Sequence, residues 1–213
     1  MYADKGTVSD NDSAGNHVGY ALMYSAGLSV TGNRSDGDRD HGLLLNYANG
    51  ARIEGNAVVA GGEKCVFIYN SIKNVFRGNW FAGCHIGIHL TAGSERNAIS
   101  GNAFIGNRTQ VKYVGTRYQE WSASGRGNYW SDNPAFDLNG DGVADQPYRP
   151  NDLIDQVVWS YPLAKLLLNS PAVQTVRFAQ ARFPALLPGG VVDSAPLMAP
   201  PVVPASMAAE PAG

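Results

Sequence analysis

The stretch Val30-Thr31-Gly32-Asn33 returns three times along the chain. Its copies are Ile53-Glu54-Gly55-Asn56, Phe76-Arg77-Gly78-Asn79 and Ile99-Ser100-Gly101-Asn102, and each follows the one before at the same 23-residue step. A fixed period of about 20 to 50 residues is typical of solenoid proteins, in which one repeat cannot bury its apolar face alone. The period therefore predicts a solenoid.

The residues within each repeat favour strands over helices. Val111-Lys112-Tyr113 and Ile88-His89-Leu90 alternate apolar and polar residues, which is the period of a half-buried strand. Parallel stacking of such strands would place the asparagines in a ladder of amides, namely Asn33, Asn56, Asn79 and Asn102. The glycine before each asparagine permits a left-handed turn. We therefore predict an all-β, right-handed parallel β-helix with 23-residue rungs over residues 1–127.

The same 23-residue step predicts two apolar columns along the solenoid. One column contains Leu44, Phe67, Leu90 and Tyr113, and the other contains Val58, Phe81 and Phe104. Residues in one column should pack on each other in successive rungs, because each rung repeats the position of the rung before it.

Composition and charge narrow the functional classes. The chain has 213 residues, 16% charged residues and a formal net charge of −2, which gives no electrostatic reason to expect nucleic acid as a partner. The N-terminus lacks a basic segment followed by an apolar core, so no secretory signal is predicted. Val8-Ser9-Asp10-Asn11 lies almost one full period before the first Gly-Asn stretch, so a repeat is already under way. We expect the C-terminal part of a longer protein.

The two cysteines occupy different positions of the repeat. Cys65 aligns with Ile88, whereas Cys84 aligns with Gly61, four positions away along a regular rung. At about 3.3 Å per residue this offset exceeds the reach of a disulfide, so two buried free thiols are expected.

A copper-binding alternative concerns the segment that starts at Cys84. Cys84, His85 and His89 combine a soft thiolate with imidazoles, which suits copper. The two histidines would lie about 13 Å apart in an extended strand, which favours two exposed histidines and one core thiol instead.

An acidic loop is predicted within residues 128–150. Oxygen-bearing side chains stand at the positions of a calcium loop, with Gly142 as the turn glycine, and they are Asp137, Asn139, Asp141 and Asp145. Tyr148 stands where the bidentate glutamate of such a loop belongs. An Asx-rich turn without metal would use the same residues, and both interpretations stay open.

The composition changes after residue 150. Pro162 opens an apolar stretch, and Asn169-Ser170-Pro171 supplies an N-cap and a first-turn proline for a helix ending near Phe183. We predict a helical hairpin over 151–198 and a disordered tail over 199–213. The hairpin could cap the solenoid or dock on a membrane subunit through Leu163, Leu166, Leu167, Leu168, Val173 and Val176.

Several motifs together are similar to the NosD family and span nearly the whole chain. They are residues 86–97, 110–116, 127–132, 148–153, 164–174 and 188–194. NosD proteins are periplasmic right-handed β-helices that act with an ATPase and a membrane permease, as an ABC-type complex, in assembling the copper sites of nitrous oxide reductase. The signal peptide and early rungs of the family are absent from this sequence.

The resemblance implies a periplasmic protein that is not an enzyme. Its implied partners are the permease, the ATPase, a copper chaperone and nitrous oxide reductase, with copper as a transient cargo. Calcium as a structural ion is an expectation from the residue pattern of the acidic loop alone. The alternatives are a β-helix polysaccharide lyase, a uronate epimerase or a glycan-binding protein. A lyase would use the column Leu43, Val66, His89 and Lys112, and a glycan-binding groove would expose Trp80, Trp121 and Trp130.

Overall fold

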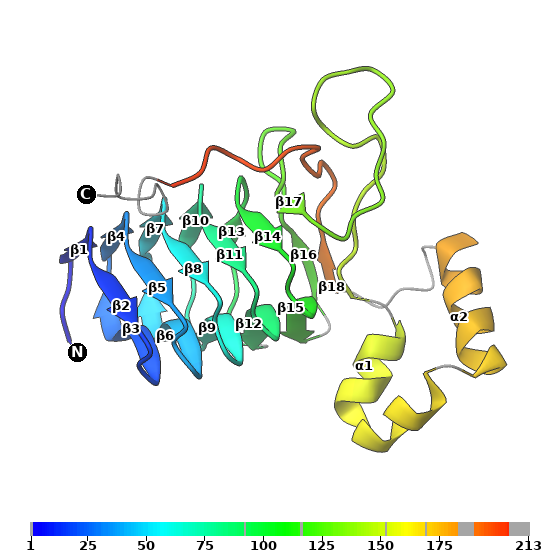
Figure 1. Cartoon of the computed structure of the whole chain (residues 1–213), viewed down its shortest axis with the longest axis horizontal. Helices are drawn as coiled ribbons and strands as arrows, with labels where there is room; N and C mark the ends of the chain where they lie inside the picture. The colour runs from blue at the N-terminus through cyan, green and yellow to red at the C-terminus, as the bar shows by residue number, and fades with distance from the viewer. Residues whose placement is uncertain are drawn as a thin grey trace, which may run out of the picture.

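The computed structural model describes residues 2–91, 93–115, 117–151, 153–168, 170–182 and 190–204. Three parallel sheets, A, B and C, wind into a β-solenoid of about five turns, as Figure 1 shows. Sheet A contains β1 (Thr7–Ser9), β4 (Ser29–Thr31), β7 (Arg52–Glu54), β10 (Val75–Arg77) and β13 (Ala98–Ile99). Sheet B contains β2 (Asp12–Ala14), β5 (Arg34–Asp36), β8 (Ala57–Val59), β11 (Trp80–Ala82), β14 (Ala103–Ile105) and β17 (Tyr129–Trp130). Sheet C contains β3 (Val18–Ala26), β6 (His41–Asn49), β9 (Lys64–Tyr69), β12 (Ile86–Thr91) and β15 (Thr109–Val114).

The core lies between the three sheets. Sheet A contributes the buried side chains of Val30, Ile53, Phe76 and Ile99, which are the residues two positions before the glycines of the repeat. Sheet B contributes the predicted column of Val58, Phe81 and Phe104. Burial of an aliphatic or aromatic side chain contributes about 1.5 to 3 kcal/mol, so each additional rung adds apolar stabilisation.

The predicted asparagine ladder is present. Asn79 donates its backbone N–H and its side-chain N–H to Oδ1 of Asn102, at 3.1 and 2.8 Å. Its side-chain nitrogen also donates to the backbone oxygen of Ile53, at 2.8 Å. The glycine before each asparagine is in the left-handed region, with φ between 64° and 70° in Gly32, Gly55, Gly78 and Gly101. The ladder therefore satisfies buried amides from rung to rung.

The predicted column of Leu44, Phe67, Leu90 and Tyr113 is wrong. The corner after β11 is one residue shorter than the corner after β8, so β12 pairs with β9 one residue short of the regular period, and Phe67 pairs with His89. Leu44 and Phe67 consequently belong to an outer column that continues to His89 and Lys112. The inner column of sheet C is formed by Leu22, Leu45, Ile68, Leu90 and Tyr113.

The far end of the solenoid is closed by a segment that returns from much later in the sequence. β16 (Tyr118–Glu120) pairs in parallel with β18 (Gly190–Val192). Asp193 then accepts hydrogen bonds from the backbone of Asn128 at 2.6 Å and from Nε1 of Trp130 at 2.8 Å. Its carboxylate thus replaces the next asparagine of the ladder. A Cβ on Gly127 would lie 1.7 Å from Asp193 Oδ1, which explains a glycine there.

The helical region is an insertion into this closing rung. It contains α1 (Leu153–Ser160), the 3-10 helix η1 (Pro162–Leu167) and α2 (Pro171–Arg182). α1 contacts both η1 and α2, and the three lie beyond the end of the solenoid in Figure 1. Among the described residues, no helix is long and apolar enough to span a lipid bilayer.

Two predicted boundaries need correction. Residues 190–198 belong to the end of the solenoid rather than to a hairpin reaching residue 198, because β18 pairs with β16. Residues 128–130 likewise belong to the last rung, since β17 pairs with β14. Of the predicted tail, residues 199–204 have no regular secondary structure, and residues 205–213 lie outside the described residues.

Candidate functional site

The two cysteines form a disulfide, so the expectation of free thiols is wrong. Cys65 lies in β9 and Cys84 in the corner before β12, and their Cα atoms are 5.6 Å apart. The chain turns from sheet B into sheet C at this corner, so four sequence positions do not correspond to four strand steps in a line. A Cβ on Gly61 would lie 2.5 Å from Cys84 Sγ, so the glycine makes room for the bond.

The three copper candidates are not brought together. The sulfur of Cys84 is in the disulfide, and His85 lies at the outer corner, where Nδ1 is 3.6 Å from Glu63 Oε1. His89 lies on the outer face of sheet C and stacks on Phe67, with ring centroids 4.9 Å apart. In the part of the chain that the structure describes, no three His, Cys, Asp or Glu side chains are placed to share a metal ion.

His89 has an unusual electrostatic setting. Burial, together with the positive charges of Lys112 and Lys64, lowers the pKa of its imidazole to about 4. Nδ1 of the ring is buried and makes no hydrogen bond. His89 is therefore neutral at pH 7.

The acidic loop adopts the Asx-turn arrangement. Asp137 accepts hydrogen bonds from the backbone N–H groups of Gly140 and Gly142, at 2.7 and 2.8 Å. These bonds lower the pKa of Asp137. Asn139, Asp141 and Asp145 likewise accept backbone hydrogen bonds within the loop. The carboxylates are thus satisfied by the loop itself, and these contacts give no support for calcium.

The features expected for glycan chemistry do not assemble either. With the corrected register, the outer column at His89 contains Phe67 below it and Lys112 above it, which leaves two titratable members. Trp121 and Trp130 are buried at the closed end of the core, and Trp80 is half-buried. The predicted row of exposed tryptophans is therefore absent among these three.

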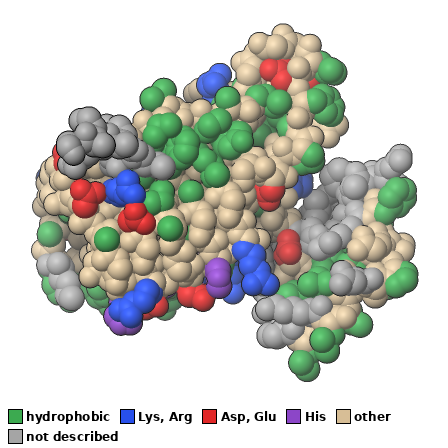
Figure 2. All heavy atoms as spheres, in the orientation of Figure 1, with side chains coloured by type: hydrophobic (Ala, Val, Ile, Leu, Met, Phe, Trp, Pro, Cys, Tyr) green, Lys and Arg blue, Asp and Glu red, His purple; other side chains and the backbone are tan. Residues whose placement is uncertain are grey.

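The helical insertion exposes large apolar side chains. Leu163, Leu166 and Leu167 of η1 are 82%, 85% and 60% exposed, and Val176 and Phe178 of α2 are also exposed. Of the other expected docking residues, Leu168 and Val173 are half-buried. Figure 2 shows hydrophobic side chains on the outside of this region. These exposed apolar side chains are candidates for an interaction surface.

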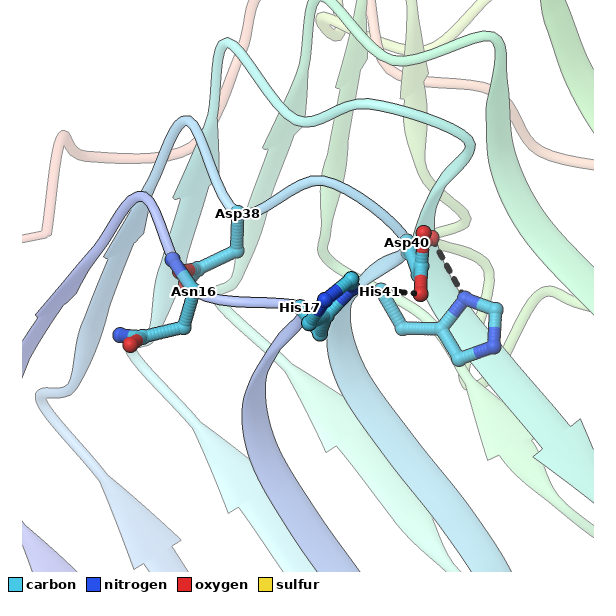
Figure 3. A network of polar contacts seen from close by, with 5 residues as sticks. All are labelled: Asn16, His17, Asp38, Asp40 and His41. Atoms are coloured by element: carbon cyan, nitrogen blue, oxygen red, sulfur yellow. Dashed lines mark hydrogen bonds and ion pairs between the residues drawn. The ribbon is translucent and has the colours of Figure 1, made fainter.

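The sequence reasoning missed a row of polar side chains at the outer corner between sheets B and C. His17 Nδ1 lies 3.3 Å from Asp40 Oδ2, as Figure 3 shows. Glu63 and His85 form a second such pair in the following turns. The 23-residue period could have predicted this row. Asp40 follows His17 at that spacing, and Glu63 follows Asp40 at the same spacing.

Comparisons with known proteins find a matching family and two similar proteins. The sequence model of the family described as "Periplasmic copper-binding protein (NosD)" matches residues 1–135. The "Probable ABC transporter binding protein NosD" of Stutzerimonas stutzeri is 51% identical over 193 residues, covering 84% of this chain and 44% of the relative. Its counterpart in Pseudomonas aeruginosa is 53% identical over 184 residues, covering 80% of this chain and 43% of the relative.

The chain thus spans less than half the length of these two relatives. The family match covers more than half of the chain, and the identities lie far above the level of chance resemblance. The chain belongs to the NosD family.

Proposed function

We propose that this chain is part of a periplasmic component of an ABC-type complex that assembles the copper centres of nitrous oxide reductase. In this proposal the solenoid contacts the copper and the protein that donates or accepts it. The helical insertion docks the solenoid on the permease and its ATPase. The family description as a periplasmic copper-binding protein and the relatives' names as ABC transporter binding proteins support this role.

The observation that carries the proposal is the separation of the insertion from the solenoid core. The core is closed by β16, β18 and the buried side chains of Trp121 and Trp130. The solenoid therefore has an end cap that does not use Leu163, Leu166 or Leu167. Burying these three leucines against a partner would contribute about 5 to 9 kcal/mol before association entropy is subtracted.

The disulfide agrees with a periplasmic location. Disulfides form and persist in oxidising compartments and are rare in the cytosol. The bond between Cys65 and Cys84 joins two neighbouring turns of the solenoid.

The test is the substitution Leu167→Asp in the complete protein. Because Leu167 is 60% exposed, the thermal midpoint and the circular dichroism of the variant should stay unchanged. Co-purification with the permease and ATPase should be lost, and nitrous oxide reductase should lack its catalytic copper cluster. Leu138→Asp is the matched control, because Leu138 is 84% exposed in the acidic loop.

Three results would contradict this assignment. If Leu167→Asp unfolds the protein, Leu167 is needed for the stability of the fold and its docking role is withdrawn. Normal co-purification and normal reductase maturation would remove its docking role. Loss of binding to lipid vesicles with retained permease binding would assign the leucines to the membrane surface instead.

A further inference from the structure

We propose that the outer face of sheet C is a docking surface for an acidic segment of a partner protein. The surface consists of a row of aromatic rings and two lysines, and we call it the sheet C patch. Its residues are Tyr24, Tyr47, Phe67, Tyr69, Lys64 and Lys112. This inference rests on the proposed function, in which the solenoid contacts a protein that donates or accepts copper, and it names the chemistry of the segment that makes the contact.

The aromatic rings of the patch contact one another from turn to turn. The ring centroids of Tyr24 and Tyr47 are 5.3 Å apart, and those of Tyr47 and Tyr69 are 6.0 Å apart. Tyr69 in turn lies 6.2 Å from Phe67. The three tyrosines are 40% to 44% exposed, and no other large apolar side chain that the structure describes between residues 3 and 113 is as exposed. Exposed tyrosines gathered in one row are typical of protein interfaces, where tyrosine is enriched.

The backbone at Tyr24 and Tyr47 disfavours a bulky side chain. Their φ angles are 50° and 51°, in the left-handed region. One period later the same position holds Asn70, with φ 43°. Asparagine and glycine adopt this conformation at a lower cost than tyrosine does. The backbone of these turns alone would therefore favour asparagine, and a binding surface gives a reason for the exposed rings.

The patch presents ring edges and hydroxyl groups to a partner. The planes of Tyr24 and Tyr47 lie at 7° to each other, and Phe67 stacks on His89 at 27°. Asn70 Nδ2 donates to the hydroxyl oxygen of Tyr47 at 3.0 Å, so the hydroxyl proton remains for a partner. The edges of aromatic rings carry partial positive charge. This arrangement favours carboxylate and carbonyl oxygens over a sugar ring, which needs a free aromatic face.

Two lysines add positive charge beside the rings. Lys64 Nζ lies 5.3 Å from the ring centroid of Phe67, and Lys112 pairs in register with His89. Among the ion pairs of the described residues, neither lysine pairs with a carboxylate. Both charges, after burial, lower the pKa of His89, so they converge on this part of the sheet. The two lysines are two turns apart, about 10 Å along the solenoid axis, so one extended segment can contact both.

The carboxylates at the neighbouring corner have other partners. Asp40 and Glu63 pair with His17 and His85 rather than with the lysines of the patch. An acidic segment along the patch would contact the lysines, the ring edges and the tyrosine hydroxyls together. A basic segment would be repelled by the lysines. Charge complementarity therefore selects an acidic partner.

The test is titration of the purified full chain with fluorescently labelled poly-L-glutamate at low ionic strength, measured by fluorescence anisotropy. The parent should bind the polymer. Lys64→Gln combined with Lys112→Gln should weaken binding about fivefold or more, since two ion pairs are lost. Lys73→Gln combined with Arg77→Gln is the matched control, because it removes two exposed positive charges beside sheet A. This control should bind as the parent does.

A second variant separates binding from stability. Tyr24→Asn combined with Tyr47→Asn should weaken binding about threefold or more, because it removes two ring edges and two hydroxyls. Its thermal midpoint should stay close to that of the parent, since Asn70 already occupies the same position one turn later.

Four outcomes would overturn the proposal. The first is no binding of poly-L-glutamate to the parent, and the second is equal weakening by the control and by the lysine variant, which would indicate attraction by net charge alone. The third is binding of polygalacturonate without binding of poly-L-glutamate, which would assign the patch to an acidic glycan. The fourth is a tyrosine variant that binds as the parent does, which would leave the row without a docking role. None of these outcomes affects the co-purification test of Leu167→Asp, because that test concerns the helical insertion.

Discussion

The solenoid and the helical insertion differ in how far their apolar side chains are buried. In the solenoid, buried amides such as Asn79 are hydrogen-bonded to the turns on both sides, and the apolar columns are closed from solvent. In the insertion, Leu163 and Leu166 stand almost fully exposed. The solenoid thus buries most of its large apolar side chains within its own core, whereas the insertion exposes several of its leucines. Substitutions should therefore affect stability in the first region and association in the second.

The largest expected effect is at Asp193, where the returning segment closes the solenoid. Asp193→Ala leaves the backbone N–H of Asn128 and Nε1 of Trp130 without their acceptor. We expect a loss of about 3 kcal/mol or more in the free energy of unfolding, measured by urea denaturation. Asp193→Asn keeps one acceptor oxygen and should lose less. Equal losses would show that hydrogen bonding at this position is unimportant.

Loss of the disulfide should lower the free energy of unfolding almost as much as Asp193→Ala does. It closes a loop with a sequence separation of 19, and such a loop corresponds to about 3 kcal/mol in the chain-entropy description. Cys65→Ser combined with Cys84→Ser should lower the thermal midpoint accordingly.

Gly61→Ala sharpens this test, because its new Cβ would lie 2.5 Å from Cys84 Sγ. It should destabilise the parent and have a much smaller effect in a Cys84→Ala background. An equal effect in both backgrounds would mean that Gly61 is required for another reason.

A smaller effect is expected in the middle of the ladder. Asn79→Ala removes the acceptor of the Asn56 backbone N–H and side-chain N–H, at 2.9 and 3.0 Å. The free energy of unfolding should fall by about 1 to 3 kcal/mol. Asn139→Ala is the control from an exposed loop and should leave thermal melting unchanged. An unchanged midpoint for Asn79→Ala would contradict the role of the ladder.

The smallest effect is a pH dependence set by His89. Burial lowers the pKa of His89 from 6.5 to about 4 in the folded chain. As the pH falls, His89 is protonated in the unfolded chain before it is protonated in the folded chain. The free energy of unfolding should therefore fall as the pH drops from 6.5 towards 4. After solvent screening, we expect a contribution of about 1 to 2 kcal/mol. His89→Gln should flatten urea-unfolding free energies across this window, and an unchanged slope would contradict this account.

The sequence predicted the solenoid because its information is local and periodic. The Gly-Asn pair identifies a left-handed turn and a buried amide, and its 23-residue spacing fixes the stacking of Asn33 to Asn102. A second ladder of Asn74 and Asn97 follows the same period. These features could be read without coordinates, since each depends on one turn and its neighbour.

The remaining features depend on the path of the chain in space. One residue fewer in the corner after β11 moved His89 beside Phe67, and the bend of that corner brought Cys84 to Cys65. Asp193 reaches Asn128 across 65 positions, after a helical insertion. Period and composition determined that turns would stack, because each turn buries what its neighbour exposes. Corner lengths and the returning strand decided which side chains meet, because a bend or a long-range contact leaves no periodic trace in the sequence.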